Sequence, residues 1–298
     1  MEKHEIQRLG KRDLGSHAFE DCMPDKILDI LATEADSNNL PDVIPKLAQL
    51  LRADGKVSVI YLCHAGAVQI YKLPNEGAHF CGYRNLQTLC LALATNHAVP
   101  LSAGAREALS SKLTVLEVQD RIEAAWEAGI NSHGRVQTGG IKGTRKHVGS
   151  SEAEALLLSL GVKCTGHAFS GPKAWTELLD AVEAYFSSCP AMNADDTSLG
   201  QAGQGEEFGE SIHITTRPPL FLQRPKHSIT IVGIERTVSG KRRLLGFDPA
   251  WKPPGVMRKE TLTQDDLTGL KAKWVLKLYR KGGRYLRKWK QFEMVCVD

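Results

Sequence analysis

The sequence lacks any apolar run of membrane-spanning length, since its longest apolar stretches, residues 156–158 and 89–94, are far shorter than the roughly 18 residues that a spanning helix needs. The first five residues carry charges of both signs and lead into no apolar segment or cleavage site, so no signal peptide is expected. These absences predict a cytoplasmic or nuclear protein that does not interact with membranes.

Cysteine spacing excludes two further classes. The seven cysteines, at positions 22, 63, 81, 90, 164, 189 and 296, are odd in number and contain no C-x-x-C pair. This pattern argues against a disulfide framework and against a zinc finger. We therefore expect no metal and no cofactor, and most of the cysteines to be small buried residues.

What is present is enough apolar sequence for a sizeable core. The 298 residues are 42% hydrophobic and 24% charged, which predicts one or two globular domains. Residues 1–52 begin polar and continue into a short helical pattern interrupted by prolines. We interpret them as an N-terminal helical arm on a main domain of residues 53–298.

The hydrophobic periodicity predicts helices first and strands second, an α+β fold with an antiparallel sheet. A hairpin is expected from residues 57–63 and 67–73, and an exposed loop over 189–210. Helices are expected over residues 81–94, 115–128, 151–160 and 174–187. Strands are expected over residues 162–168, 219–223, 228–235, 242–247, 272–279 and 291–297.

Cys81 stands where a turn-rich segment becomes a buried helix, and Gly82 follows it. The positive end of a helix favours a thiolate, and a nearby histidine cation lowers the thiol pKa further. The backbone N–H groups of both residues would point at an oxyanion, and Gly82 would let a substrate backbone approach. A cysteine at the start of a buried helix is more often a core residue, so this feature alone does not identify Cys81 as a nucleophile.

His227 opens one apolar strand and Asp248 closes the next. In adjacent antiparallel strands the start of one lies beside the end of the other, so these side chains are expected to be neighbours. An aspartate at that distance can orient an imidazole against a thiolate. The alternative is an edge histidine and a turn aspartate without chemistry.

Three stretches, in order, resemble the UfSP and ZUFSP cysteine peptidases, which cleave ubiquitin or the related ubiquitin-fold modifier. Residues 80–89 (FCGYRNLQTL) resemble the nucleophile motif. Residues 119–129 (QDRIEAAWEAG) with 143–152 (GTRKHVGSSE) resemble the middle of the domain. Residues 218–223 (PPLFLQ), 227–235 (HSITIVGIE) and 247–249 (FDP) resemble the histidine and aspartate strands. The resemblance covers about residues 67–297.

The resemblance implies a papain-like cysteine peptidase fold with Cys81 as nucleophile, His227 as general base and Asp248 as its orienter. Gln69 is the candidate side-chain oxyanion donor, with an outward polar position on a strand as its alternative. Glu152 matches a glutamate expected to meet the basic tail of the modifier, with a plain helix-cap role as its alternative.

The form of the nucleophile motif is nearer the deubiquitinating branch, so we expect ubiquitin or polyubiquitin as the partner. The alternatives are the ubiquitin-fold modifier and a non-catalytic binding module. No zinc finger precedes the domain, so a preference for long chains is not expected. Two departures concern the tail groove: His79-Phe80 stands before the nucleophile where animal enzymes usually carry tryptophan, and His147 replaces an aromatic residue.

Basic residues concentrate near the C-terminus. The formal net charge is +4, yet residues 271–290 hold nine Lys or Arg and no Asp or Glu, so the rest of the chain is net acidic. Nucleic-acid binding would use this segment, with Trp274, Tyr279, Tyr285 and Trp289 as stacking groups. The solvated face of a half-buried strand is the favoured interpretation.

Overall fold

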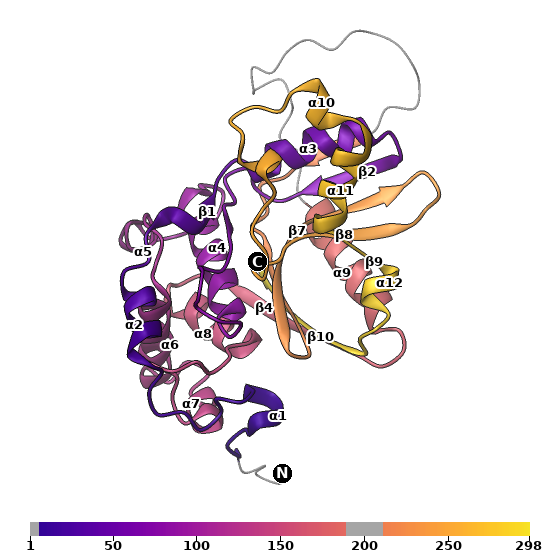
Figure 1. Cartoon of the computed structure of the whole chain (residues 1–298). Coiled ribbons are helices and arrows are strands. Elements are labelled where there is room, and N and C mark those ends of the chain that lie inside the picture. Colours follow the sequence, from indigo (N-terminus) through magenta and orange to yellow (C-terminus); the bar gives the residue numbers. More distant parts are fainter. Residues whose placement is uncertain (1–5, 189–210) are drawn as a thin grey trace.

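The protein has a helical half and a sheet half that meet along a long central strand (Figure 1). The computed structural model describes residues 6–188 and 211–298. Within those ranges no helix combines the length and apolar character needed to cross a membrane. The expected α+β order, with helices mainly first and strands mainly second, is confirmed.

The main sheet has eight strands. Its principal path runs β4 (Cys164–Ser170), β10 (Gln291–Val297), β6 (Leu220–Arg224), β7 (His227–Thr237), β2 (Val57–Leu62) and β5 (Ser211–Ile214). β8 (Arg242–Phe247) pairs with β7, and β9 (Arg280–Gly282) pairs with β8. The pairs are antiparallel apart from β2 with β5, which is parallel. The sheet is therefore mixed at this one edge.

β7 organises the sheet because it is long and buried along almost its whole length. One edge pairs with β8, and the other is shared between β6 at its start and β2 at its end. Apolar Ile229, Ile231, Val232 and Ile234 supply core side chains on this strand. Its first residue is thereby held at a fixed position against the helical half.

Two hydrophobic cores cover the sheet. One is built mainly on α4 (Cys81–Thr95), α6 (Val115–Glu127) and α8 (Ser150–Ser159), with Phe221 and Val295 from the sheet. The other joins the sheet to α3 (Val43–Asp54), α9 (Ala174–Ser187) and α11 (Gly269–Tyr279). The described part of the N-terminal arm enters both cores, through Leu31 in the first and Leu47 in the second.

Short elements complete the chain. They are α1 (Lys11–Leu14), α2 (Asp25–Ala32), β1 (Asn39–Leu40), β3 (Gln69–Ile70), α5 (Ala103–Ala108), α7 (His133–Thr138), α10 (Gln264–Leu267) and α12 (Gly283–Leu286), with 3-10 turns Asp36–Asn38 and Gly255–Arg258. The four longer predicted helices and five of the six predicted single strands are confirmed within a few residues at their ends. The expected loop over 189–210 lies outside the described residues.

Two predicted elements are wrong. The hairpin over 57–63 and 67–73 does not form, because β2 pairs with β7 and β5, while β3 pairs with β1. The strand over 272–279 is instead helix α11, whose buried residues Ala272, Val275, Leu276 and Tyr279 follow helical spacing. The lysines of this segment therefore lie on the solvated face of a helix.

Candidate active site

Cys81 is the first residue of α4, and its side chain is half-buried at the junction between α4 and β7. Leu86, Leu89 and Leu93 are buried in the helical core, which fixes the helix axis. The N–H groups of the first turn have no carbonyl four residues earlier in the helix and form its positive end. The cysteine thus stands where a thiolate and an oxyanion are both stabilised.

The environment of Cys81 favours its ionised form. Burial alone would raise the pKa of this thiol, but hydrogen bonding and charge from His227, together with the hydroxyl and backbone of Ser228, lower it overall. The opposite holds for four other described cysteines, because burial raises the pKa of Cys63, Cys90, Cys164 and Cys296. This contrast makes Cys81 the candidate nucleophile.

His227 and Asp248 are neighbours, as the strand argument predicted. β7 begins at His227, β8 ends at Phe247 opposite Thr230, and His227 Nε2 lies 2.9 Å from Asp248 Oδ1. Burial alone would lower the pKa of His227, but hydrogen bonds and charges from Asp248 and Cys81 raise it to about 9. Because Asp248 engages Nε2, Nδ1 is the nitrogen that remains for the thiol. The two shifts in pKa, downward for Cys81 and upward for His227, both favour the thiolate and imidazolium forms of the pair.

Asp248 is held ionised by more than His227. Its Oδ1 also accepts the Ala250 N–H at 3.1 Å, and its Oδ2 lies 3.6 Å from Lys281 Nζ on β9. Burial alone would raise the pKa of Asp248, but the hydrogen bond and charge of His227 and the charge of Lys281 lower it. Sequence reasoning placed Lys281 only in a basic run, because its contact with Asp248 depends on the pairing of β9 with β8.

Buried hydrogen bonds fix the position of the start of α4 relative to the start of β7. Asn85, one turn after Cys81, donates from Nδ2 to Ser228 Oγ at 3.0 Å and accepts from Thr230 Oγ1 at 2.9 Å. All three side chains are almost completely buried. Since Ser228 follows His227 directly, this clamp sets the register between α4 and β7. The i+4 spacing from Cys81 to Asn85 was the available sequence signal.

The arginine of the nucleophile motif anchors the helix to the N-terminal arm. Arg84 is fully buried and pairs with Glu76 at 2.5 Å and with Glu34. Gln87 also donates to Glu34 Oε1, at 2.6 Å. Tyr83, in the same motif, donates its hydroxyl hydrogen to the Lys146 carbonyl at 3.0 Å. These motif residues position α4, which begins at Cys81.

Gly82 packs closely against Val148 inside the protein. A Cβ at this position would lie 2.5 Å from the Val148 carbonyl oxygen and 2.7 Å from a Val148 methyl group. The space that a Cβ would occupy is therefore filled by residue 148, which requires glycine here, while the approach of a substrate backbone to Gly82 stays a prediction.

Glu152 caps its own helix. Its Oε2 accepts the Gly149 N–H at 2.7 Å, and the residue is only 7% exposed. Burial raises the pKa of Glu152, even though the Gly149 N–H opposes that shift. The helix-cap alternative is thus present, while contact with a modifier tail stays a prediction. Exposed Glu293 accepts a hydrogen bond from Ser150 at the start of the same helix.

Gln69 lies in β3, an element that contacts α4. It is fully buried, so the alternative of an outward polar residue is wrong. Its Oε1 accepts the Tyr279 hydroxyl hydrogen at 2.9 Å, while its Nε2 is buried without a described partner. An orphan donor of this kind is a group that an incoming oxygen would satisfy. Its role as oxyanion donor stays a prediction.

Three histidines cluster close to the start of α4. The His79 ring lies 4.4 Å from that of His17 and 5.9 Å from that of His147, measured between centroids. Burial and the neighbouring histidines lower the pKa of His79, and burial together with His17 lowers that of His147. The two departures from the family motif therefore lie together, and His17 joins them from the arm.

The aromatic residues of the basic segment do not form a stacking surface. Tyr279 is buried, and Arg224 lies over the rings of Tyr285 and Trp289, at 5.7 Å and 4.3 Å from their centroids. Trp274 is 54% exposed on α11. This arrangement leaves one of the four aromatics open to a base.

The described residues bring together a helix-start thiol whose pKa is lowered, a histidine on an antiparallel strand whose pKa is raised, and a carboxylate hydrogen-bonded to that histidine. This is the arrangement of papain-like cysteine peptidases, in which the thiolate attacks a carbonyl and the histidine protonates the leaving amine. The described residues include no group of three or more His, Cys, Asp or Glu able to hold a metal.

The model of Peptidase family C78 matches residues 56–295, so the chain belongs to this family of cysteine peptidases. Zinc finger-containing ubiquitin peptidase 1 of Macaca fascicularis is 30% identical over 223 residues, and that of Homo sapiens is 29% identical over 225. Each match covers 73% of this chain and 34% of the relative, so the chain aligns with about a third of these relatives' length.

The crystal structure of UfSP from C. elegans is also similar. It has a TM-score of 0.43 and 14% identity over 80% of this chain and 34% of that chain.

Proposed function

We propose that this cysteine peptidase is a deubiquitinase, which cleaves the peptide or isopeptide bond after the C-terminal glycine of ubiquitin. The observation that carries the proposal is the Cys81, His227 and Asp248 arrangement, with the pKa of the thiol lowered and that of the imidazole raised. The choice of ubiquitin is supported by the relatives named as ubiquitin peptidases.

In the acylation step the Cys81 thiolate attacks the carbonyl carbon of the terminal glycine. The oxyanion that forms is stabilised by the N–H groups at the start of α4, with the Gln69 amide as the proposed second donor. His227 passes its proton to the leaving amine as the C–N bond breaks. The products are a free amine and a thioester between Cys81 and the modifier.

In the deacylation step His227, now neutral, takes a proton from water, and the hydroxide oxygen attacks the thioester carbonyl. The C–S bond breaks and restores the thiolate and imidazolium, and the modifier leaves as a carboxylic acid that loses its remaining proton to solvent to become a carboxylate. Asp248 stays ionised throughout, because His227 and Lys281 both lower its pKa.

The basic tail of ubiquitin would need carboxylates beside Cys81. Glu152 was the residue expected to meet it, and its burial leaves little surface for a direct contact. Exposed Glu293, hydrogen-bonded to Ser150 beside Glu152, is the more accessible carboxylate in that region. We therefore include both carboxylates in the proposed tail contact, with Glu152 acting mainly through the helix start.

Two probes that carry a C-terminal electrophile, one built on ubiquitin and one on the ubiquitin-fold modifier, test the proposal side by side. The ubiquitin probe should form a covalent adduct that maps to Cys81 and disappears in Cys81→Ala. Labelling by the modifier probe alone would show that the substrate is the ubiquitin-fold modifier, and the assignment of the triad residues would be unchanged. Labelling by neither, with Cys81 reactive to iodoacetamide, would contradict both substrates.

A non-catalytic modifier-binding module is the other class considered from the sequence. The arrangement of Cys81, His227 and Asp248 argues against it, since a binding module has no need of a thiol whose pKa is lowered. Turnover of a ubiquitin substrate by the wild-type chain, lost in Cys81→Ala, separates these two functions.

A further inference from the structure

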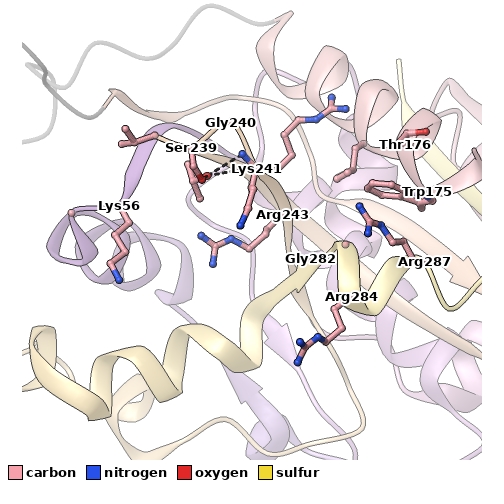
Figure 2. Close-up of a pocket in the computed structure, with 16 residues that line it drawn as sticks. Lys56, Trp175, Thr176, Ser239, Gly240, Lys241, Arg243, Gly282, Arg284 and Arg287 are labelled. Atoms are coloured by element: carbon pink, nitrogen blue, oxygen red, sulfur yellow. Dashed lines mark hydrogen bonds between the residues drawn. The ribbon is translucent and has the colours of Figure 1, made fainter.

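A large basic hollow lies away from the triad, at the turn between β7 and β8. Its volume is about 1020 Å³, within the size range of ligand sites. Four segments line it: the start of β2, the start of α9, residues 237–243 of the β7–β8 turn, and the junction of β9 with α12. Figure 2 shows that its side chains come from elements far apart in sequence.

The described lining contains six cations and no Asp or Glu. They are Lys56, Lys241, Arg242, Arg243, Arg284 and Arg287, and Figure 2 labels all of them except Arg242. Like charges brought to one concave surface repel each other, and an anion in the hollow relieves that repulsion.

Two of the cations form ion pairs with carboxylates that lie outside the lining of the hollow. Arg242 pairs with Asp180 at 2.6 Å and Glu183 at 2.9 Å, and Arg243 pairs with Glu235 at 2.6 Å. These carboxylates hold the two arginines but do not line the hollow. The pairing explains how arginines can be concentrated here without unfolding the β7–β8 turn.

The other four cations have no carboxylate partner among the described residues. Lys56, Lys241, Arg284 and Arg287 are all exposed, and Arg287 lies over the Trp175 ring, 4.6 Å from its centroid. Stacking on the ring orients the guanidinium without neutralising its charge. The hollow therefore has a surplus of positive charge with arginine forks at its rim.

We propose that this hollow is a binding site for a compact polyphosphorylated ligand. Guanidinium groups bind phosphate oxygens through two parallel hydrogen bonds, and lysines add point charges, so several phosphates match this lining better than one. A compact ligand is favoured over a nucleic-acid strand because the lysines of α11, which would extend a track, do not line the hollow.

The test uses the full chain and tripolyphosphate as the probe, titrated by calorimetry at about 50 mM KCl without divalent cations, where electrostatic contacts are weakly screened. The double variant Lys241→Glu/Arg284→Glu should weaken binding by at least about tenfold, because it reverses two unpaired charges. The control Lys273→Glu/Lys277→Glu makes the same charge change on α11, outside the hollow, and should weaken binding less than about twofold.

Thermal unfolding checks that each variant is folded, and Lys241→Gln/Arg284→Gln replaces the charge-reversed pair if it is not. Equal losses in both double variants would show diffuse attraction and overturn the site. Absence of wild-type binding, or binding of citrate as tight as that of tripolyphosphate, would overturn the phosphate class. A single-stranded oligonucleotide that binds more tightly than tripolyphosphate would overturn the compact-ligand class.

Discussion

The two ends of β8 differ in how completely their charged side chains are paired. At the end of the strand, Asp248 has His227 on one oxygen and Lys281 near the other, and all three groups are largely buried. At its start, Arg242 and Arg243 face a hollow whose other cations are exposed and without described carboxylate partners.

The difference separates a preorganised site from one that awaits a ligand. At the Asp248 end the charges needed for catalysis are already balanced, so chemistry requires little reorganisation. At the Arg242 end the balance is incomplete, and an anion would supply it. Since β9 pairs with β8, Gly282 lines the hollow while the preceding residue, Lys281, reaches Asp248.

Substitutions of His227 and Asp248, at the end of β8 where the charges are paired, should have the largest effect on activity. His227→Ala removes the proton donor and should lower kcat/KM by ~10⁴-fold, about as much as Cys81→Ala, because such residues act as a unit. Asp248→Asn keeps a hydrogen-bond acceptor but loses the charge, so a smaller loss of ~10²-fold is expected. Steady-state hydrolysis of a ubiquitin C-terminal fluorogenic substrate measures both.

The pH profile of the same variants sharpens this prediction. Because the pKa of His227 is raised to about 9, wild-type kcat/KM should fall as pH rises through that value and the imidazolium loses its proton. Asp248→Asn removes the principal group that raises this pKa, so the alkaline limb should move to lower pH. An unmoved limb would show that Asp248 does not set the His227 titration.

Lys281 offers an intermediate test. Lys281→Met removes a charge that lowers the pKa of Asp248, so that pKa should rise and the acid limb of kcat/KM should move upward in pH. We expect kcat/KM to fall by ~3–10-fold at neutral pH, because Lys281 Nζ lies as far as 3.6 Å from Asp248 Oδ2 and Asp248 keeps its other partners in the variant. Lys288→Met, in the same basic segment, is the control. Equal profiles for both variants would remove Lys281 from the positioning machinery.

The sequence predicted that His227 and Asp248 are neighbours because they lie at the ends of strongly periodic strands, whereas their catalytic roles with Cys81 were implied by the family resemblance. α4, β7 and β8 each carry a clear apolar pattern, and the antiparallel pairing of neighbouring strands brought His227 to Asp248. By contrast, Lys281 reaches Asp248 only because β9, more than thirty residues further along the chain, adds to β8. No local pattern encodes that pairing.

The wrong predictions have physical reasons of the same kind. β2 was assigned to a hairpin with the segment after it, but its antiparallel partner β7 lies about 175 residues away in sequence. In 272–279 the alternation of lysine with apolar residues suggested a strand, whereas the 272, 275, 276, 279 spacing of the buried residues is helical. Packing against α3 and the sheet core selects the second pattern.

The smallest effect should be that of salt on the reactivity of Cys81, which lies beside the paired charges of His227 and Asp248. Raising KCl from about 50 to about 500 mM screens exposed charges strongly and buried pairs much less. Alkylation of Cys81 by iodoacetamide, an uncharged reagent, reports the thiolate without substrate, and its rate should change less than about twofold. Tripolyphosphate affinity at the other end should fall by at least about tenfold over the same range. Mass spectrometry of the Cys81 peptide separates its alkylation from that of exposed Cys22. A Cys81 rate as salt-sensitive as the tripolyphosphate affinity would mean that the triad charges are solvent-screened, and the contrast between the two ends of β8 would be lost.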